Sequence, residues 1–155
     1  MIHPQLRRPF LIISCGKTKG SHPAPAAELY IGNLFSASRR HAQERGLPWA
    51  ILSALHGLVR PEARIAPYDL SMSDRLLRGE AELAQYKAQL RQQLTELLEG
   101  SGCDGVEIHA GYDYARMLRP LSPLPVVEPL AGLGMGERLG WYKQPPLFGY
   151  GGGGR

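Results

Sequence analysis

Three titratable side chains could carry out acid–base chemistry. Asp69 follows a Pro-Tyr pair in a predicted loop, where its carboxylate could position a water molecule or stabilise a developing cation. His56 lies in a turn after a predicted strand and His109 ends one, and at either place an imidazole could stabilise a departing anion. Ordinary alternatives exist as well, because Asp69 could close a turn and either histidine could pack in the core.

A second group of residues could bind phosphate or a nucleobase. Lysines supply positive charge, small residues expose main-chain N–H groups to an anion, and tyrosines can stack on a base. The candidate binding residues are Ser14, Cys15, Gly16, Lys17, Lys19, Tyr30, Ser53, Tyr68, Gly134 and Gly136. Surface lysines, tight turns and tyrosines packed in the core are the plain alternatives for members of this group.

Several familiar cofactor motifs are excluded. A phosphate-binding P-loop that ended at Gly16-Lys17-Thr18 would need a glycine where Leu11 stands. The glycines of residues 132–136 have GxGxG spacing after the last predicted strand, which is not the dinucleotide fingerprint. The two cysteines have no CxxC spacing, and no His, Cys or Asp cluster has metal-ligand spacing. The sequence therefore predicts a protein without a cofactor or a metal.

The elements that must position these residues alternate between strand and helix. Short apolar runs predict strands at 10–14, 49–53, 105–109 and 125–128, and helical spacing predicts helices at 26–45, 75–100, 114–119 and 137–143. Strands that are apolar on both faces are typical of a parallel sheet covered on both sides. We therefore expect an α/β fold with one mostly parallel sheet flanked by helices, whose strand ends gather the candidate residues at one edge.

Composition limits the class of protein. The chain of 155 residues suits one domain, with an N-terminal arm at 1–9, the α/β domain at 10–144 and a flexible tail at 145–155. No apolar run approaches the roughly 20 residues that span a bilayer, which predicts a cytoplasmic protein without a membrane partner. The net charge of +4 permits DNA, including single-stranded DNA, or RNA as a partner.

Five short motifs, taken together, carry a resemblance over residues 10–142. They are Ser14-Cys15-Gly16-Lys17-x-Lys19, Ala27-x-Leu29-Tyr30-x-Gly32-x-x-Phe35, Ile51-Leu52-Ser53-Ala54-x-x-Gly57-Leu58, Pro67-Tyr68-Asp69 and Pro129-Leu130-x-Gly132-Leu133-x-x-Gly136-Glu137-Arg138-Leu139. This set resembles a bacterial and phage family that is defined only as a domain of unknown function. That family is distantly similar to the YaaA peroxide-stress proteins, to the domain attached to archaeosine synthases and, more remotely, to uracil-DNA glycosylases.

The resemblance implies a three-layer architecture like that of uracil-DNA glycosylase, and work on nucleobases in DNA or RNA. The leading hypothesis is a DNA glycosylase that hydrolyses the N-glycosidic bond of a modified or damaged pyrimidine. A non-catalytic DNA- or RNA-binding module and an enzyme on free nucleosides or nucleotides are the alternatives. In the leading hypothesis Asp69 positions water or stabilises the sugar, and His56 or His109 stabilises the departing base. Gathering of Lys17, His56, Asp69 and His109 around one cavity would favour the enzyme hypotheses, and scattering would count against them.

Overall fold

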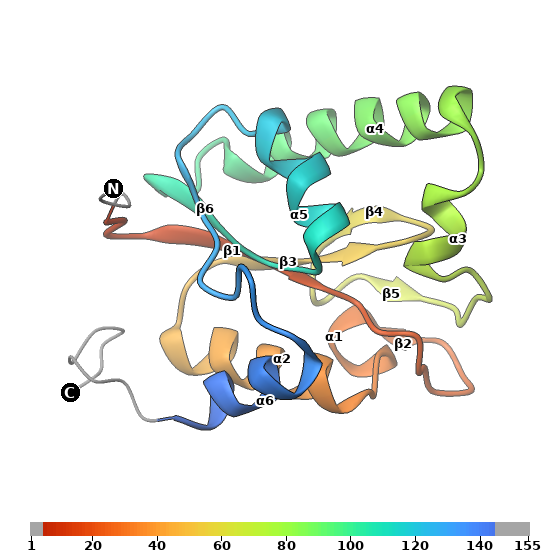
Figure 1. The fold of residues 1–155 in the computed structure, drawn as a ribbon, viewed down its shortest axis with the longest axis horizontal. Coiled ribbons are helices and arrows are strands. Elements are labelled where there is room, and N and C mark those ends of the chain that lie inside the picture. The colour runs from red at the N-terminus through yellow and green to blue at the C-terminus, as the bar shows by residue number, and fades with distance from the viewer. Residues whose placement is uncertain (1–4, 145–155) are drawn as a thin grey trace.

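The computed structural model describes residues 5–144, in which a five-stranded sheet lies between two layers of helices (Figure 1). The strands are β1 (Pro9–Ser14), β3 (Trp49–Ser53), β4 (Gly57–Val59), β6 (Gly105–His109) and β7 (Val126–Val127). Their order in the sheet is β4-β3-β1-β6-β7, and only β4 is antiparallel to its neighbour. The expected α/β domain with a mostly parallel, helix-flanked sheet is therefore confirmed.

Helices cover both faces of the sheet. In Figure 1 one layer holds α3 (Met72–Leu76), α4 (Glu80–Leu98) and α5 (Tyr112–Leu118), and the other holds α1 (Ala26–Leu29), α2 (Asn33–Arg45) and α6 (Met135–Lys143). A 3₁₀ turn, η1 (Arg119–Leu121), follows α5, and β2 (Ala24–Pro25) pairs with β5 (Arg64–Ile65) in a separate small ribbon. Within residues 5–144, no helix has both the length and the apolar character needed to cross a membrane.

β1 is apolar from Pro9 to Ile13 because both of its faces are buried. Phe10 and Ile12 pack with α4 and α5 in one core, whereas Ile13 packs with α1 and α2 in the other. Each of the four residues 10–13 exposes 2% of its surface or less. The unbroken apolar run in the sequence is thus the signature of a central strand with helices above and below.

Two predicted helices are interrupted. Residues 30–32 separate α1 from α2, so the predicted helix at 26–45 is two helices. The predicted helix at 75–100 is broken before Glu80, because Gly79 adopts a φ of +101° that a right-handed helix does not allow. The predicted strand at 125–128 shortens to two residues. The strands predicted at 49–53 and 105–109 are confirmed at both ends.

The chain reverses after β3 in a hairpin whose second strand, β4, was not predicted from the sequence. Gly57 has a φ of +74°, which lets β4 turn back antiparallel to β3. At the other end of the domain, the arm bonds to the loop before β6, since the main-chain N–H groups of Arg7 and Arg8 donate to Asp104 at 2.7 and 2.9 Å. The predicted flexible tail at 145–155 lies outside the described residues.

The order of connections creates a crevice between β1 and β6. The chain passes from β1 through α2, in one helix layer, to β3 on one side of β1. It then returns through α4, in the opposite layer, to β6 on the other side of β1 (Figure 1). The loops after β1 and β6 therefore lead to opposite faces of the sheet. Ligands of open α/β sheets bind in the crevice that such a switch of direction leaves at the carboxyl ends of the strands.

Candidate functional site at the carboxyl ends of β1 and β6

A cavity of about 680 Å³ lies at this crevice. Its size is within the ~300–1,000 Å³ that is usual for small-molecule sites. Six of the sequence-predicted site residues line it, namely Ser14, Cys15, Gly16, Lys17, Asp69 and His109. The loop after β1, the loop before α3 and the end of β6 thus bring one cation, one carboxylate and one imidazole to the same space.

Helices α2 and α6 also contribute residues to this cavity, and none of these residues was predicted from the sequence. Ser38 of α2 and Arg138 and Tyr142 of α6 also line it. Arg138 ties α6 to the end of β6, because its Nη1 donates to the carbonyl of Ala110 at 3.0 Å and its Nε donates to that of Leu133 at 2.9 Å. The spacing of four between Arg138 and Tyr142, which puts both on one helix face, was the signal available in the sequence.

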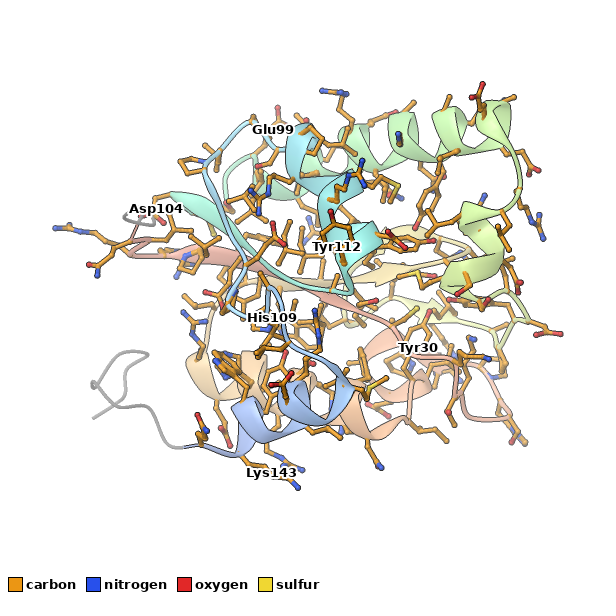
Figure 2. All side chains as sticks on the ribbon, in the orientation of Figure 1. Tyr30, Glu99, Asp104, His109, Tyr112 and Lys143 are labelled. Carbon is orange, nitrogen blue, oxygen red and sulfur yellow. The ribbon has the colours of Figure 1, made fainter. Side chains whose placement is uncertain are left out.

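His109 is held by hydrogen bonds at both ring nitrogens. Its Nε2 lies 2.7 Å from Oε2 of Glu107, and its Nδ1 lies 2.6 Å from the hydroxyl of Tyr142. The side chain points from the end of β6 toward the layer of α2 and α6 (Figure 2). Both ring nitrogens of His109 are therefore engaged by protein groups, and the catalytic role expected for it stays a prediction.

A buried ion pair lies beneath His109. Arg45 Nη1 is 2.7 Å from Oε2 of Glu107, and these side chains are only 11% and 10% exposed. Burial opposes the ionisation of Glu107, but the hydrogen bonds from His109 and Arg45, together with the Arg45 charge, outweigh it and lower the pKa of the carboxyl. The sequence signal for this pair was a glutamate inside an otherwise apolar strand, two residues before His109 and therefore on the same face.

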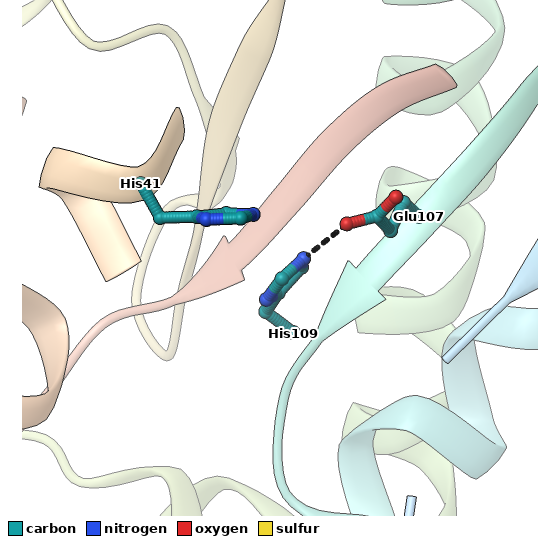
Figure 3. Close-up of side chains that lie close together, drawn as sticks. All are labelled: His41, Glu107 and His109. Atoms are coloured by element: carbon teal, nitrogen blue, oxygen red, sulfur yellow. Dashed lines mark hydrogen bonds and ion pairs between the residues drawn. The ribbon is translucent and has the colours of Figure 1, made fainter. Parts of the chain in front are cut away.

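His41, Glu107 and His109 form a cluster whose potential ligand atoms all lie within 4.8 Å of one another (Figure 3). Such a set could hold a metal ion. Here the Arg45 guanidinium already supplies the cation, since Nη1 bonds Glu107 and lies 3.5 Å from Nε2 of His41. Burial, reinforced by the Arg45 charge, lowers the pKa of His41 to about 4. We therefore interpret the cluster as a charge-compensated hydrogen-bond network.

Five predicted residues form a separate network on the β3 side and do not line the cavity: Lys19, Tyr30, Ser53, His56 and Tyr68. The Tyr68 hydroxyl lies 2.7 Å from both the Tyr30 hydroxyl and Ser53 Oγ. Lys19 Nζ lies over the Tyr68 ring, 4.2 Å from its centroid. Because Tyr68 precedes Asp69, this network fixes the loop that carries the carboxylate to the cavity.

His56 lies away from the cavity because the β3–β4 hairpin turns it back along the sheet. Its ring meets the Tyr68 ring edge-on with centroids 5.5 Å apart, and its main-chain N–H donates to Ser53 Oγ at 3.1 Å. The side-chain amides of Gln89 and Gln93 both donate to its carbonyl. Burial lowers the pKa of His56. The prediction that His56 and His109 lie at one cavity is therefore wrong, because only His109 lines it.

At the start of α6, the main-chain N–H of Gly134 is already bonded within the protein. The N–H of Gly134, the residue before the helix, donates to the carboxylate of Glu137 at 2.9 Å. The protein's own carboxylate thus occupies the position that a phosphate was expected to take. Neither Gly134 nor Gly136 lines the cavity, although Met135 between them does.

Cys15 and Tyr68 connect the cavity to the second network. Cys15 lines the cavity, and its Sγ lies 3.9 Å from the Tyr68 hydroxyl. Burial raises the pKa of the Cys15 thiol, which outweighs the opposing effect of hydrogen bonds and of the Lys19 charge. A thiol with a raised pKa is a weak nucleophile at neutral pH, so its position favours packing and contact over covalent chemistry.

The fold and site define a single α/β domain with a ligand cavity at the switch point of its sheet. The model of a family of unknown function, DUF6884, matches residues 10–144, and the chain belongs to this family. No curated protein matches the chain, and no solved structure does. The expectation of a domain-of-unknown-function family is confirmed, and the more distant similarities stay predictions.

Proposed function

We propose that the protein is an N-glycosidic-bond hydrolase that releases a modified or damaged pyrimidine base from DNA. The observation that carries the proposal is that Lys17, Asp69 and His109, from three separate segments, line one cavity of about 680 Å³. Hydrolysis of this bond needs a group that stabilises a cationic sugar and one that handles the proton of water, whereas a binding module needs only the cation.

Three charged groups at the cavity have roles in this proposal. Lys17 binds the phosphate next to the target nucleotide, and Arg138, which also lines the cavity, adds positive charge. The exposed carboxylate of Asp69 stabilises the sugar as the base departs. A base inside a duplex must leave the stack to reach such a cavity, so the DNA substrate is bound with its nucleotide flipped out.

The uracil-DNA-glycosylase-like architecture belongs to the same proposal. It is supported by helices on both faces of a sheet whose four parallel strands run in the order β3-β1-β6-β7, and by a cavity at their carboxyl ends. The distant similarity to the YaaA peroxide-stress proteins and to the archaeosine-synthase domain is part of this inference, as is a cytoplasmic location.

A free nucleotide is the second candidate substrate. Two carboxylates, Asp69 and Asp74, line the same cavity. The hydroxyl and main-chain N–H of Ser71 hold the pKa of Asp74 low, which keeps this carboxylate charged. Negative charge at the cavity repels a polyanionic DNA backbone more than a single nucleotide with one phosphate. This feature favours a small substrate over a long one.

Base release from a panel of substrates tests the proposal. The panel comprises duplex and single-stranded DNA with uracil, 5-hydroxymethyluracil or hypoxanthine, and deoxyuridine monophosphate as the free nucleotide. Alkali-induced strand breaks report on DNA, and chromatography of the free base reports on the nucleotide. We expect release from a pyrimidine substrate. Binding that falls steeply with salt but releases no base from any substrate would identify a binding module instead.

Two variants and one control test the roles proposed for Asp69 and Lys17. Asp69→Asn should lower kcat about 100-fold or more, in line with the loss of one electrostatic contact to the transition state. Lys17→Met should raise KM with a smaller effect on kcat, because a phosphate contact is made before and during the reaction. Asp113→Asn, an exposed carboxylate on α5, is the matched control and should behave as the wild type. Full activity of Asp69→Asn would remove Asp69 from the mechanism.

A further inference from the structure

We propose that Tyr142 is the proton acceptor of the cavity and contacts the attacking water, with His109 and Glu107 behind it as a buried proton relay. The reaction in which the relay works rests on the proposed function. The direction of the hydrogen bonds in the relay is independent of that function and can be measured without any substrate.

The ion pair sets the direction of the hydrogen bonds. Oε2 of Glu107 accepts from Arg45 Nη1 at 2.7 Å and lies 2.7 Å from His109 Nε2. A carboxylate only accepts, so His109 Nε2 carries a proton and donates it. In a neutral imidazole the other nitrogen, Nδ1, is then an acceptor. The Tyr142 hydroxyl, 2.6 Å away, donates to it.

This direction leaves the Tyr142 oxygen able to accept hydrogen bonds. Tyr142 lines the cavity together with Ser38 and His109. The Ser38 hydroxyl can donate either to the carbonyl of Leu34, at 2.9 Å, or to the Tyr142 oxygen, so at least one lone pair of that oxygen is left for a ligand. An acceptor oxygen backed by a base is therefore available at the wall formed by β6, α2 and α6. A water molecule or a substrate hydroxyl that bonds there donates its proton.

Tyr142 needs the histidine to act as a base. Burial raises the pKa of Tyr142 to about 12, against the opposing influence of Ser38 and Arg138, so the phenol keeps its proton at neutral pH. A protonated phenol is a poor base on its own. It can accept a proton from a water molecule in the cavity if it transfers its own proton to Nδ1 of His109 at the same time. Glu107 stabilises the imidazolium that forms, as a buried carboxylate does in other base relays.

Packing fixes the geometry of the relay. The His109 and Tyr142 rings are stacked with an angle of 22° between their planes and centroids 5.8 Å apart. Trp141 lies edge-on to both rings and to His41. The titratable and charged groups that face His109 are Glu107 on its own strand, His41 and Arg45 on α2, and Tyr142 and Arg138 on α6.

In the proposed hydrolysis the relay works in both directions. The bond between C1′ of the sugar and the base breaks, and the base leaves with the electron pair. Water bonds to C1′ and gives one proton to the Tyr142 oxygen, while the phenolic proton moves to Nδ1 of His109. The imidazolium then returns a proton through Tyr142 to the departed base. Water is thereby divided between sugar and base, and the protein regains its starting state.

Tyr142→Phe tests the role in catalysis, because it removes one oxygen and keeps the stacked ring. We expect kcat to fall about 10²- to 10⁴-fold with KM changed by less than about threefold, the range for loss of a general base. Tyr112→Phe, which alters an exposed tyrosine on α5, is the control and should match the wild type. Wild-type kcat in Tyr142→Phe would overturn the proposal and leave the proposed function standing.

Nitrogen NMR of the histidines tests the relay without a substrate. At neutral pH, His109 should show a protonated Nε2 and an unprotonated Nδ1, and the Nδ1 resonance should shift in Tyr142→Phe but not in Tyr112→Phe. A proton on Nδ1, or a charged imidazolium, would overturn the proposal whatever the activity. If no substrate releases its base while the expected tautomer is found, the proposed function fails and the relay stands.

Discussion

Arg45 and Glu107 form an ion pair of 2.7 Å in which each side chain is about nine-tenths buried. The pair joins α2 to β6 beneath the cavity and receives the hydrogen bond that orients His109. Its energetic value lies less in mutual attraction than in the cost of leaving either charge buried without the other. This relationship leads to the first prediction.

Arg45→Met should destabilise the protein by about 3–5 kcal/mol, because it leaves a buried carboxylate without its cation. Arg45→Met combined with Glu107→Leu should recover much of this loss, since the second change removes the orphaned charge. Urea unfolding of both variants measures the difference. Equal stability of single and double variants would show that the pair is not the source of the effect.

The low pKa of His41 predicts a loss of stability in acid. In the folded protein this pKa is about 4, against about 6.5 when the chain is unfolded, so the unfolded state binds the proton first. The contribution is fully present above pH ~6.5 and is lost as the pH falls toward 4. Allowing for partial solvent screening, the loss is on the order of 2 kcal/mol.

His41→Leu isolates this effect, because an uncharged side chain cannot take up the proton. The free energy of unfolding of the wild type should decline between pH 6.5 and 4, and that of His41→Leu should decline less over the same interval. Glu107, whose pKa is lowered, loses its contribution only below pH ~4.5 and falls outside this window. Parallel curves for the two proteins would contradict the assignment.

Tyr68→Phe should release the loop that holds Asp69. The substitution removes a hydroxyl that bonds Tyr30 and Ser53, and we expect a destabilisation of about 1–3 kcal/mol, because buried partners are left unsatisfied. A double-mutant cycle with Tyr30→Phe should give a coupling of at least 0.5 kcal/mol, as for residues in one network. Additive effects in thermal unfolding would indicate independent hydroxyls.

Gly57→Ala should destabilise the β3–β4 hairpin more than Gly46→Ala destabilises the end of α2. Both glycines have a positive φ, of +74° and +65°, so both substitutions carry a backbone cost of about 1–2 kcal/mol. Only the Cβ at residue 57 would clash with Gln93, whose side chain also bonds the hairpin at Leu58. Moving the Gln93 side chain away breaks this hydrogen bond, which adds about 0.5–1.5 kcal/mol. Chemical denaturation of both variants gives the difference directly, and similar losses would contradict the clash.

The site residues that could be predicted from the sequence are those that directly follow a buried strand. Residues 14–17 were found because a buried strand runs directly into them, and His109 was found for the same reason. His56 met the same local criterion and lies elsewhere, because the chain reverses at Gly57 rather than continuing into a helix. No property of residues 53–56 alone distinguishes the two outcomes.

The α/β class was predictable from the residues, and two of the strands were predictable at both ends, because apolar runs and helical spacing are local consequences of burial. The polar residues that follow each strand were predictable for the same reason. The position of the cavity between β1 and β6 was not, since it depends on strand order. The contact between Tyr142 of α6 and His109 of β6 was not predictable either. That contact joins residues 33 positions apart, and packing of a helix on a sheet, rather than any local preference, creates it.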